Sequence, residues 1–88
     1  MNEEQIRQWF GERGYPISEE AKITFKIIDK WLFIHNSEDE YDEVESYYLD
    51  TDYCEPIGGY PIKNFDWSTE TLTNKAKDLR QYLPADDD

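Results

Sequence analysis

The sequence predicts a small α+β domain with one helix near each end of the chain and an antiparallel β-meander between them. Apolar residues recur at helical spacing near both ends, whereas apolar and polar residues alternate in the middle, as in half-buried strands. The 88-residue chain has the size of one small domain, and its aromatic content of 16% supplies bulky side chains for a thin core. We therefore expect a single acidic domain over residues 1–88, with residues 84–88 as a frayed tail.

The first helix is predicted over residues 2–13. Asn2 can cap its first turn, and Gln5 can complete a capping box. The apolar stripe of this helix consists of Ile6, Trp9 and Phe10. Gly14 suits the left-handed conformation that commonly follows a helix, so the helix is expected to end just before it.

Residues 21–35 carry the strongest strand pattern in the chain. Polar and apolar residues alternate over 22–27, which predicts a strand with one wet face and one buried face. The next strand has apolar residues on both faces, so it is expected to be central or covered by a helix. A tight turn at residues 28–31 is weakly encoded, because neither Gly nor Asn is present to adopt a positive φ.

A polar connection at residues 36–42 precedes the third strand, which alternation predicts over residues 43–50. A short fourth edge strand near residues 60–63, after the turn signal Gly58-Gly59, is an alternative to a three-stranded sheet. The second helix is predicted over residues 68–83, with Ser68 as its cap.

The simplest packing of these elements places both helices on one face of the sheet. The other face would then carry the lysines of the first strand and the acids of the third. The predicted members of the single core are Trp9, Phe10, Phe25, Ile27, Leu32, Ile34, Leu72 and Leu79.

The central part of the chain is strongly acidic. Residues 31–62 contain no Lys and no Arg, and their nine acids account for most of the net charge of −12. This charge argues against binding to phosphate backbones or anionic membranes and favours a basic partner or a cation. Tyrosines among the acids can stack on arginine side chains. The predicted partner-binding residues are Glu38, Asp39, Glu40, Tyr41, Asp42, Glu43, Glu45, Tyr47, Tyr48, Asp50, Asp52, Tyr53 and Glu55.

No catalytic site is predicted. His35, the only histidine, follows an apolar strand and is expected to be a strand-end residue. Cys54 is the only cysteine, so no intrachain disulfide can form, and acidic neighbours should raise the pKa of its thiol and make it a poor nucleophile. The acids from Asp50 to Glu55 do not follow the calcium-binding EF-hand pattern, so neither a metal nor another cofactor is predicted.

The first residues contain no apolar signal region, and no run approaches the ~20 apolar residues of a membrane span. With a single cysteine, which is typical of a reducing compartment, these features predict a cytoplasmic protein that does not associate with membranes.

In size, charge and aromatic content, the chain is similar in general character to small acidic inhibitors that occupy nucleic-acid-binding sites. Phage anti-restriction and anti-CRISPR proteins and the immunity proteins of nuclease toxins are examples; no family motif is present, so no residue role is transferred. The first hypothesis is a non-enzymatic inhibitor that occupies the basic groove of a nucleic-acid-binding enzyme and does not bind nucleic acid itself. The alternatives are a small regulatory protein-protein interaction module with a merely solvated acidic face, and a divalent-cation-binding domain.

Overall fold

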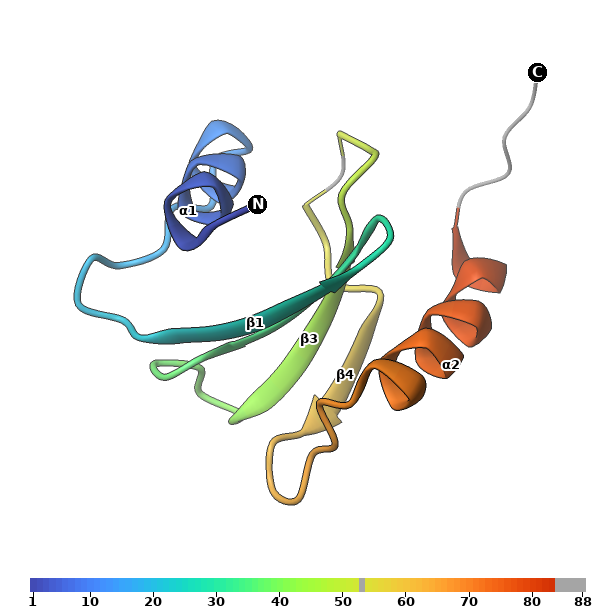
Figure 1. The fold of residues 1–88 in the computed structure, drawn as a ribbon. Helices are drawn as coiled ribbons and strands as arrows, with labels where there is room; N and C mark the ends of the chain where they lie inside the picture. Colours follow the sequence, from blue (N-terminus) through green and yellow to red (C-terminus); the bar gives the residue numbers. More distant parts are fainter. Residues whose placement is uncertain (53, 84–88) are drawn as a thin grey trace.

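The computed structural model describes residues 1–52 and 54–83 and shows a four-stranded sheet with helices packed against it (Figure 1). In chain order the elements are α1 (Glu3–Glu12), β1 (Ile23–Ile28), β2 (Trp31–Asn36), β3 (Glu43–Tyr48), β4 (Gly58–Pro61), α2 (Thr69–Leu79) and the 3₁₀ helix η1 (Arg80–Tyr82). The strand order is β1-β2-β3-β4, and neighbouring strands are antiparallel. The predicted α+β class is confirmed, in its four-stranded form. The predicted frayed tail lies outside the described residues.

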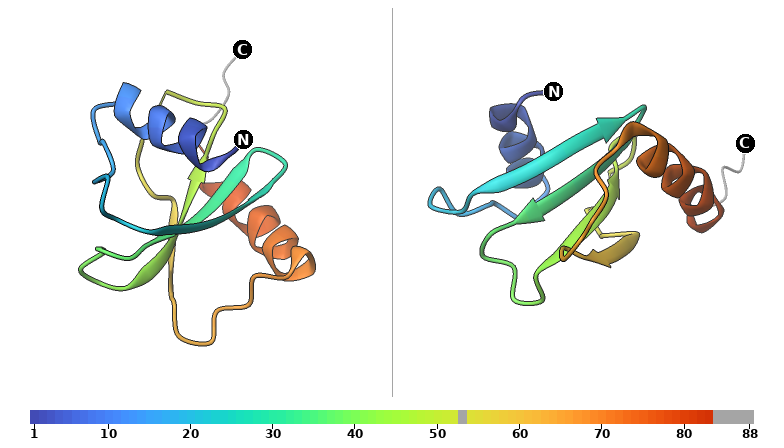
Figure 2. Two further views of the ribbon diagram at one scale, coloured as in Figure 1. Left: turned by 60° about the vertical axis from the view of Figure 1, so that its left-hand side comes forward. Right: turned by 60° about the horizontal axis from the view of Figure 1, so that its bottom comes forward.

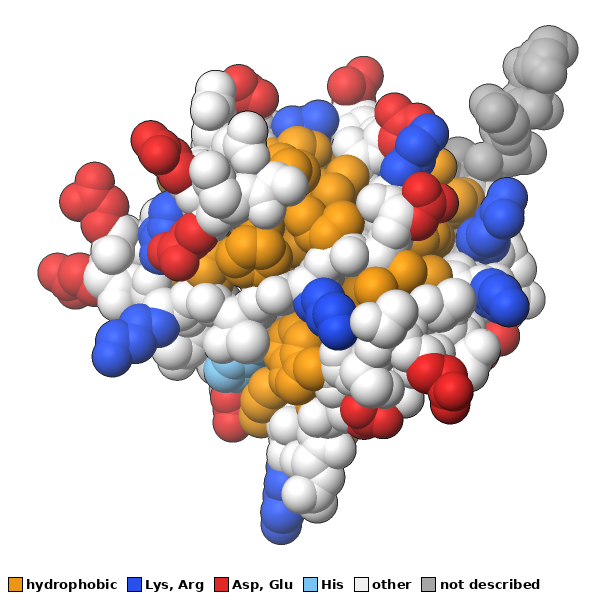
Figure 3. All heavy atoms as spheres, in the orientation of Figure 1, with side chains coloured by type: hydrophobic (Ala, Val, Ile, Leu, Met, Phe, Trp, Pro, Cys, Tyr) orange, Lys and Arg blue, Asp and Glu red, His pale blue; other side chains and the backbone are white. Residues whose placement is uncertain are grey.

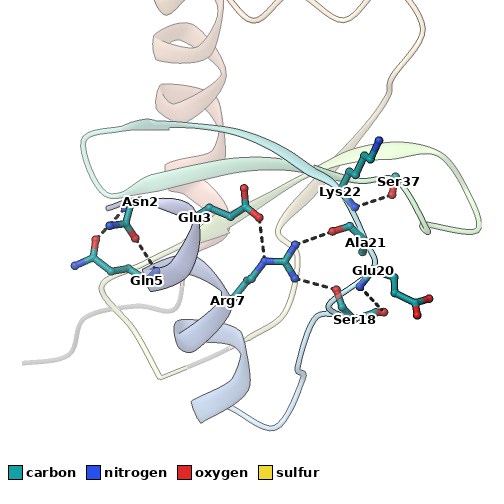
Figure 4. Close-up of polar contacts among 9 residues, drawn as sticks. All are labelled: Asn2, Glu3, Gln5, Arg7, Ser18, Glu20, Ala21, Lys22 and Ser37. Carbon is teal, nitrogen blue, oxygen red and sulfur yellow. Dashed lines mark hydrogen bonds and ion pairs between the residues drawn. The ribbon is translucent and has the colours of Figure 1, made fainter.

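The predicted capping box of α1 is present. The Asn2 side chain accepts a hydrogen bond from the backbone N–H of Gln5, and the Gln5 side chain accepts one from Asn2, both at 2.9 Å (Figure 4). Arg7 then ties the helix to the segment before β1, because its guanidinium donates to the carbonyl oxygens of Ser18 (2.9 Å) and Ala21 (2.6 Å). Local capping therefore forms α1, and one arginine fixes where the chain enters the sheet.

Positive φ angles occur at the two predicted turning points. Gly14 has φ 87° directly after α1, as expected. The hairpin between β1 and β2 is a two-residue turn in which Asp29 takes φ 55°. Asp is one of the few non-glycine residues that tolerate this region, so the turn is encoded better than the absence of Gly and Asn suggested.

The prediction that both helices lie on one face of the sheet is wrong. The side chains of β2 alternate between two separate cores: Leu32 and Ile34 pack with α1, whereas Trp31 and Phe33 pack with α2. Figures 1 and 2 show the sheet lying between the two helices. The physical reason is the apolar character of both faces of β2, since a single helical layer would leave one face exposed to water.

The predicted single core is accordingly divided. Trp9, Phe10, Leu32 and Ile34 are buried on the α1 side, with Phe25 and Ile27 packed against them, whereas Leu72 and Leu79 are buried on the α2 side. The acids of β3 also do not form a free face, because Glu45 lies on the α1 side and is half-buried. Two thin cores therefore replace one.

The fourth strand begins earlier than predicted, because Gly58 and Gly59 belong to β4 and not to a turn. A Cβ atom at Gly58 would lie 2.9 Å from both Leu79 Cδ2 and Ser46 Oγ. Glycine therefore allows the end of α2 to approach the sheet closely. Helix α2 starts at its predicted cap, where Ser68 Oγ accepts from the backbone N–H of Thr71 at 3.3 Å.

Among the described residues, no helix has both the length and the apolar character that crossing a bilayer demands.

Candidate acidic binding surface

The fold divides the acidic stretch into two groups at opposite ends of β3. The acidic loop, residues 37–43, runs from the end of β2 to the first residue of β3 and contains Glu38, Asp39, Glu40, Asp42 and Glu43. The β3–β4 connection, residues 49–57, contains Asp50, Asp52 and Glu55, while Tyr53 lies outside the described residues. A strand rises by about 3.3 Å per residue, so β3 separates the two groups by roughly 17–20 Å. The acids do not form one continuous surface.

The acidic loop is held by the side chain of Asp39 within it and by Asn36 at the end of β2. The Asp39 carboxylate accepts two backbone hydrogen bonds, from the N–H of Tyr41 at 3.1 Å and from that of Glu43 at 3.0 Å. Asn36 Oδ1 accepts from the N–H of Glu38 at 2.8 Å, and the Asn36 carbonyl accepts from the N–H of Asp39 at 2.9 Å. Short polar side chains that bond to nearby amides stabilise turns in this way. The loop conformation is therefore defined by Asn36 and Asp39.

Basic groups are scarce around the acidic loop. Asp42 Oδ1 lies 2.8 Å from His35 Nε2, and across the described parts of the chain no Lys or Arg nitrogen lies within 4.0 Å of a loop carboxylate. Glu38, Glu40 and Asp42 are exposed, and Tyr41 between them is 74% exposed. The loop thus presents carboxylates and one aromatic ring to a partner.

The β3–β4 connection has basic neighbours from distant parts of the chain. Lys30 Nζ lies 2.9 Å from Asp50 Oδ2, and this hydrogen bond raises the pKa of Lys30. Arg13 donates to the carbonyl oxygen of Thr51 at 3.2 Å while its guanidinium lies 4.1 Å from the Trp9 ring centroid. Lys30 and Arg13 therefore offset part of the negative charge at this end of β3.

Two of the predicted contact residues on β3 point into the α1 side of the protein. Tyr47 is 8% exposed, and its ring packs edge-on against Phe10 at a centroid distance of 4.9 Å. Its hydroxyl donates to Glu45 Oε1 at 3.3 Å. Burial raises the pKa of Glu45, and the carboxylates of Asp39 and Glu43 add to this effect. Burial, with the charge of Glu45 beside it, also raises the pKa of Tyr47 well above its usual range.

Tyr48 and Glu43 have intermediate positions. The Tyr48 ring lies on the α2 side of the sheet, with its centroid 5.1 Å from that of Trp31. Glu43 is half-buried where the acidic loop enters β3. Tyr47 and Tyr48, both predicted to bind the partner, thus contribute to packing, and Tyr41 is the exposed tyrosine of the acidic loop.

The structure does not bring together the two side chains most suited to nucleophilic catalysis. His35 pairs with Val44 near the acidic loop, whereas Cys54 lies in the β3–β4 connection. The pKa of the Cys54 thiol is raised as predicted, but burial is the main cause and Arg13 acts against it. An open hollow of about 440 Å³ beside Cys54 is lined by Glu12, Arg13, Tyr15, Asp52, Cys54 and Glu55. Within residues 1–52 and 54–83, no three His, Cys, Asp or Glu side chains are grouped to hold a metal ion.

Sequence reasoning identified the acids but missed the residues that position them. Asn36 and Asp39 organise the acidic loop, and the spacing Asn-x-Glu-Asp-x-Tyr carries the local signal of side chains that cap amides two residues ahead. Arg13 and Lys30 had no such signal, because they approach the β3–β4 connection only through the tertiary fold. No protein-family model, no curated protein and no solved structure matches the chain.

Proposed function

We propose that this protein is a non-enzymatic inhibitor that occupies the basic nucleic-acid-binding groove of a partner enzyme through its acidic loop. One observation carries the proposal: the loop is fixed by Asn36 and Asp39 while Glu38, Glu40 and Asp42 remain exposed around Tyr41. A pre-organised charged surface loses little conformational freedom on binding. The inhibitor acts in the cytoplasm, where nucleic-acid enzymes are accessible to it.

The chemistry of the loop suits a surface that normally binds phosphates. Grooves of this kind present Lys and Arg side chains, which pair with carboxylates as they do with phosphate oxygens. Tyr41 adds an exposed ring that can stack on a guanidinium or donate its hydroxyl hydrogen. The protein itself, with a net charge of −12, is repelled by nucleic acid and so competes for the groove without binding the substrate.

The proposal is tested on a panel of purified enzymes that comprises a restriction endonuclease, an RNA-guided nuclease and the nuclease domain of a toxin. Plasmid cleavage and binding of a fluorescent DNA duplex are measured with increasing protein. Inhibition of at least one enzyme, relieved by excess duplex, is the expected result. Absence of inhibition and of competition across the panel at about 10 µM protein contradicts the proposal and favours the interaction-module alternative.

A matched pair of variants locates the surface. Glu38→Lys combined with Glu40→Lys changes two exposed acids of the acidic loop, and Asp52→Lys combined with Glu55→Lys changes two exposed acids of the β3–β4 connection. Both pairs alter the net charge equally. The loop pair should abolish competition with the duplex, while the control pair should retain it.

A further inference from the structure

The free edge of β1 is a second candidate interaction surface. The sheet has two edge strands, β1 and β4. Strand β4 has four residues and includes two glycines and Pro61, which makes it a poor template for another strand. Strand β1 has six residues, Ile23–Ile28, without Gly or Pro. It lies nearest the viewer in Figure 1, and in the same orientation Figure 3 shows hydrophobic side chains on both sides of it.

The backbone of β1 leaves alternate residues unpaired. Ile28 and Trp31 flank the two-residue turn, and at the other end the N–H of Ser37 donates to the Lys22 carbonyl at 2.9 Å. Both observations place hydrogen-bonded pairs at even-numbered residues of β1, and such pairs alternate along an antiparallel ladder. The backbone N–H and C=O groups of the even-numbered residues therefore point toward β2. Ile23, Phe25 and Ile27 direct their N–H and C=O groups away from the sheet, and no described residue bonds to them outside the ladder.

The usual protection of an edge is missing from β1. A lysine in an edge strand commonly discourages pairing. Here Lys26 is half-buried and donates from Nζ to the Trp67 carbonyl at 3.1 Å, so its charge is drawn back toward its own chain. Arg7 occupies the Ala21 carbonyl, which limits the available edge to the residues from Ile23 onward (Figure 4).

We propose that β1 pairs antiparallel with β1 of a second copy of this chain, about a two-fold axis at Phe25. In this register every outward N–H and C=O of Ile23, Phe25 and Ile27 finds a partner. The two Phe25 side chains lie side by side, and each Ile23 lies opposite Ile27 of the second copy, which forms apolar cross-strand pairs on the α1 side. Moving the two-fold axis toward the turn, to residue 26, would place Lys26 opposite Lys26 of the second copy. Moving it the other way, to residue 24, would require the Ala21 carbonyl, which already accepts a hydrogen bond from Arg7.

The edge of β1 carries few acids. Residues 21–31 contain one acid, Asp29, whereas nine acids lie in residues 31–62. Two copies paired at this edge therefore bring few of their carboxylates together. A single strand pair buries less area than a stable dimer interface, so we expect a weak dimer with a Kd of roughly 0.1–1 mM that tightens as salt screens the net charge.

The register gives a sharp test at Thr24, which is exposed and lies opposite Lys26 of the second copy. Sedimentation equilibrium at 0.05–1 mM measures the Kd of wild type, Thr24→Lys and Thr24→Glu. Opposed like charges should weaken the Thr24→Lys dimer about threefold or more, and Thr24→Glu should tighten it. Net charge alone predicts the reverse order of dimer affinities, because Thr24→Lys lowers and Thr24→Glu raises the negative charge of each copy. Gln81→Lys and Gln81→Glu, on exposed η1, are the controls and should follow net charge.

Amide hydrogen exchange in wild type locates the contact. The amides of Ile23, Phe25 and Ile27 should exchange more slowly at 1 mM than at 0.05 mM, with no comparable change in the β4 amides. A chain that stays monomeric at 1 mM, a Thr24→Lys dimer as tight as wild type, or concentration-independent exchange at these three amides overturns the proposal. If the edge of β1 binds a strand of another protein instead, the chain stays monomeric at 1 mM. The test needs no knowledge of the partner of the acidic loop.

Discussion

Both ends of β3 are acidic in sequence, with five acids in the acidic loop and three in the β3–β4 connection, but they differ in structure. At one end, Asp39 and Asn36 fold the acidic loop around backbone amides, and exposed carboxylates remain without a nearby lysine or arginine in the described residues. At the other end, Lys30 and Arg13 reach the β3–β4 connection from other parts of the fold. The comparison shows that a run of acids defines a surface only when the positions of the bases are known in three dimensions.

The largest expected difference between the two ends is in stability. Asp39→Ala removes the acceptor of two backbone hydrogen bonds, so it should lower the free energy of unfolding by about 2 kcal/mol. Asp52→Ala, at an exposed position of the other end, should change it by less than about 0.5 kcal/mol. Urea unfolding followed by tryptophan fluorescence measures both. Equal effects of the two substitutions would mean that Asp39 does not organise the acidic loop.

A smaller effect is expected from salt. Carboxylates without local bases repel one another, and NaCl screens this repulsion, with a Debye length of about 8 Å at 0.15 M. The melting temperature should rise by roughly 3–5 °C between 20 mM and 0.5 M NaCl. Neutralising Glu38 and Glu40 as glutamines should reduce this rise more than neutralising Asp52 and Glu55. A rise that is the same in both variants would remove the electrostatic distinction between the ends.

Glu45 should have a smaller effect again, with a defined pH dependence. Its pKa is raised in the folded protein, so the folded state holds the proton more tightly than the unfolded chain does. Ionisation of Glu45 therefore reduces stability as the pH rises through the unfolded pKa of about 4.3 toward the folded value. Glu45→Gln should raise the melting temperature by about 1–2 °C at pH 7 and leave it unchanged below about pH 4. Glu55→Gln is the control, and a gain for Glu45→Gln that persists at low pH would contradict the burial argument.

The smallest expected effect is that of calcium. Neither end of β3 groups three metal-ligand side chains in the described residues. Calcium at about 0.5 mM should therefore shift the melting temperature no more than magnesium does at the same concentration. A large shift with calcium alone would restore the cation-binding alternative and place the site at one of the two acidic ends.

The sequence was sufficient for the fold class because its signals are local. Ser68, Asn2 and Gln5 cap the helices where predicted, and the alternation over residues 22–27 and 43–48 corresponds to β1 and β3. The side of the sheet that each helix covers is not a local property. It follows from the two apolar faces of β2, whose Leu32 and Phe33 belong to different cores.

The candidate site was predictable only in its charge. Alternation placed Glu45 and Tyr47 on one face of β3, but only the position of α1 determines that this face is covered. Likewise, Gly58 was expected in a turn. Its actual role depends on its close contact with Leu79, and this contact is set by tertiary packing and leaves no signal in the local sequence. Residues whose role is set by a distant element carry no local signal of that role.

The most direct measurement of the central claim is the association rate with the enzyme that the wild-type protein inhibits most strongly. Stopped-flow kinetics at 50 mM and 300 mM salt compare wild type with the two lysine pairs, Glu38→Lys with Glu40→Lys and Asp52→Lys with Glu55→Lys. If the acidic loop steers and binds the partner, the first pair should slow association at least tenfold at 50 mM salt and flatten its salt dependence. The second pair should change the rate by less than about threefold. Equal rates for the two lysine pairs, or a first pair that associates as fast as wild type, would contradict the account.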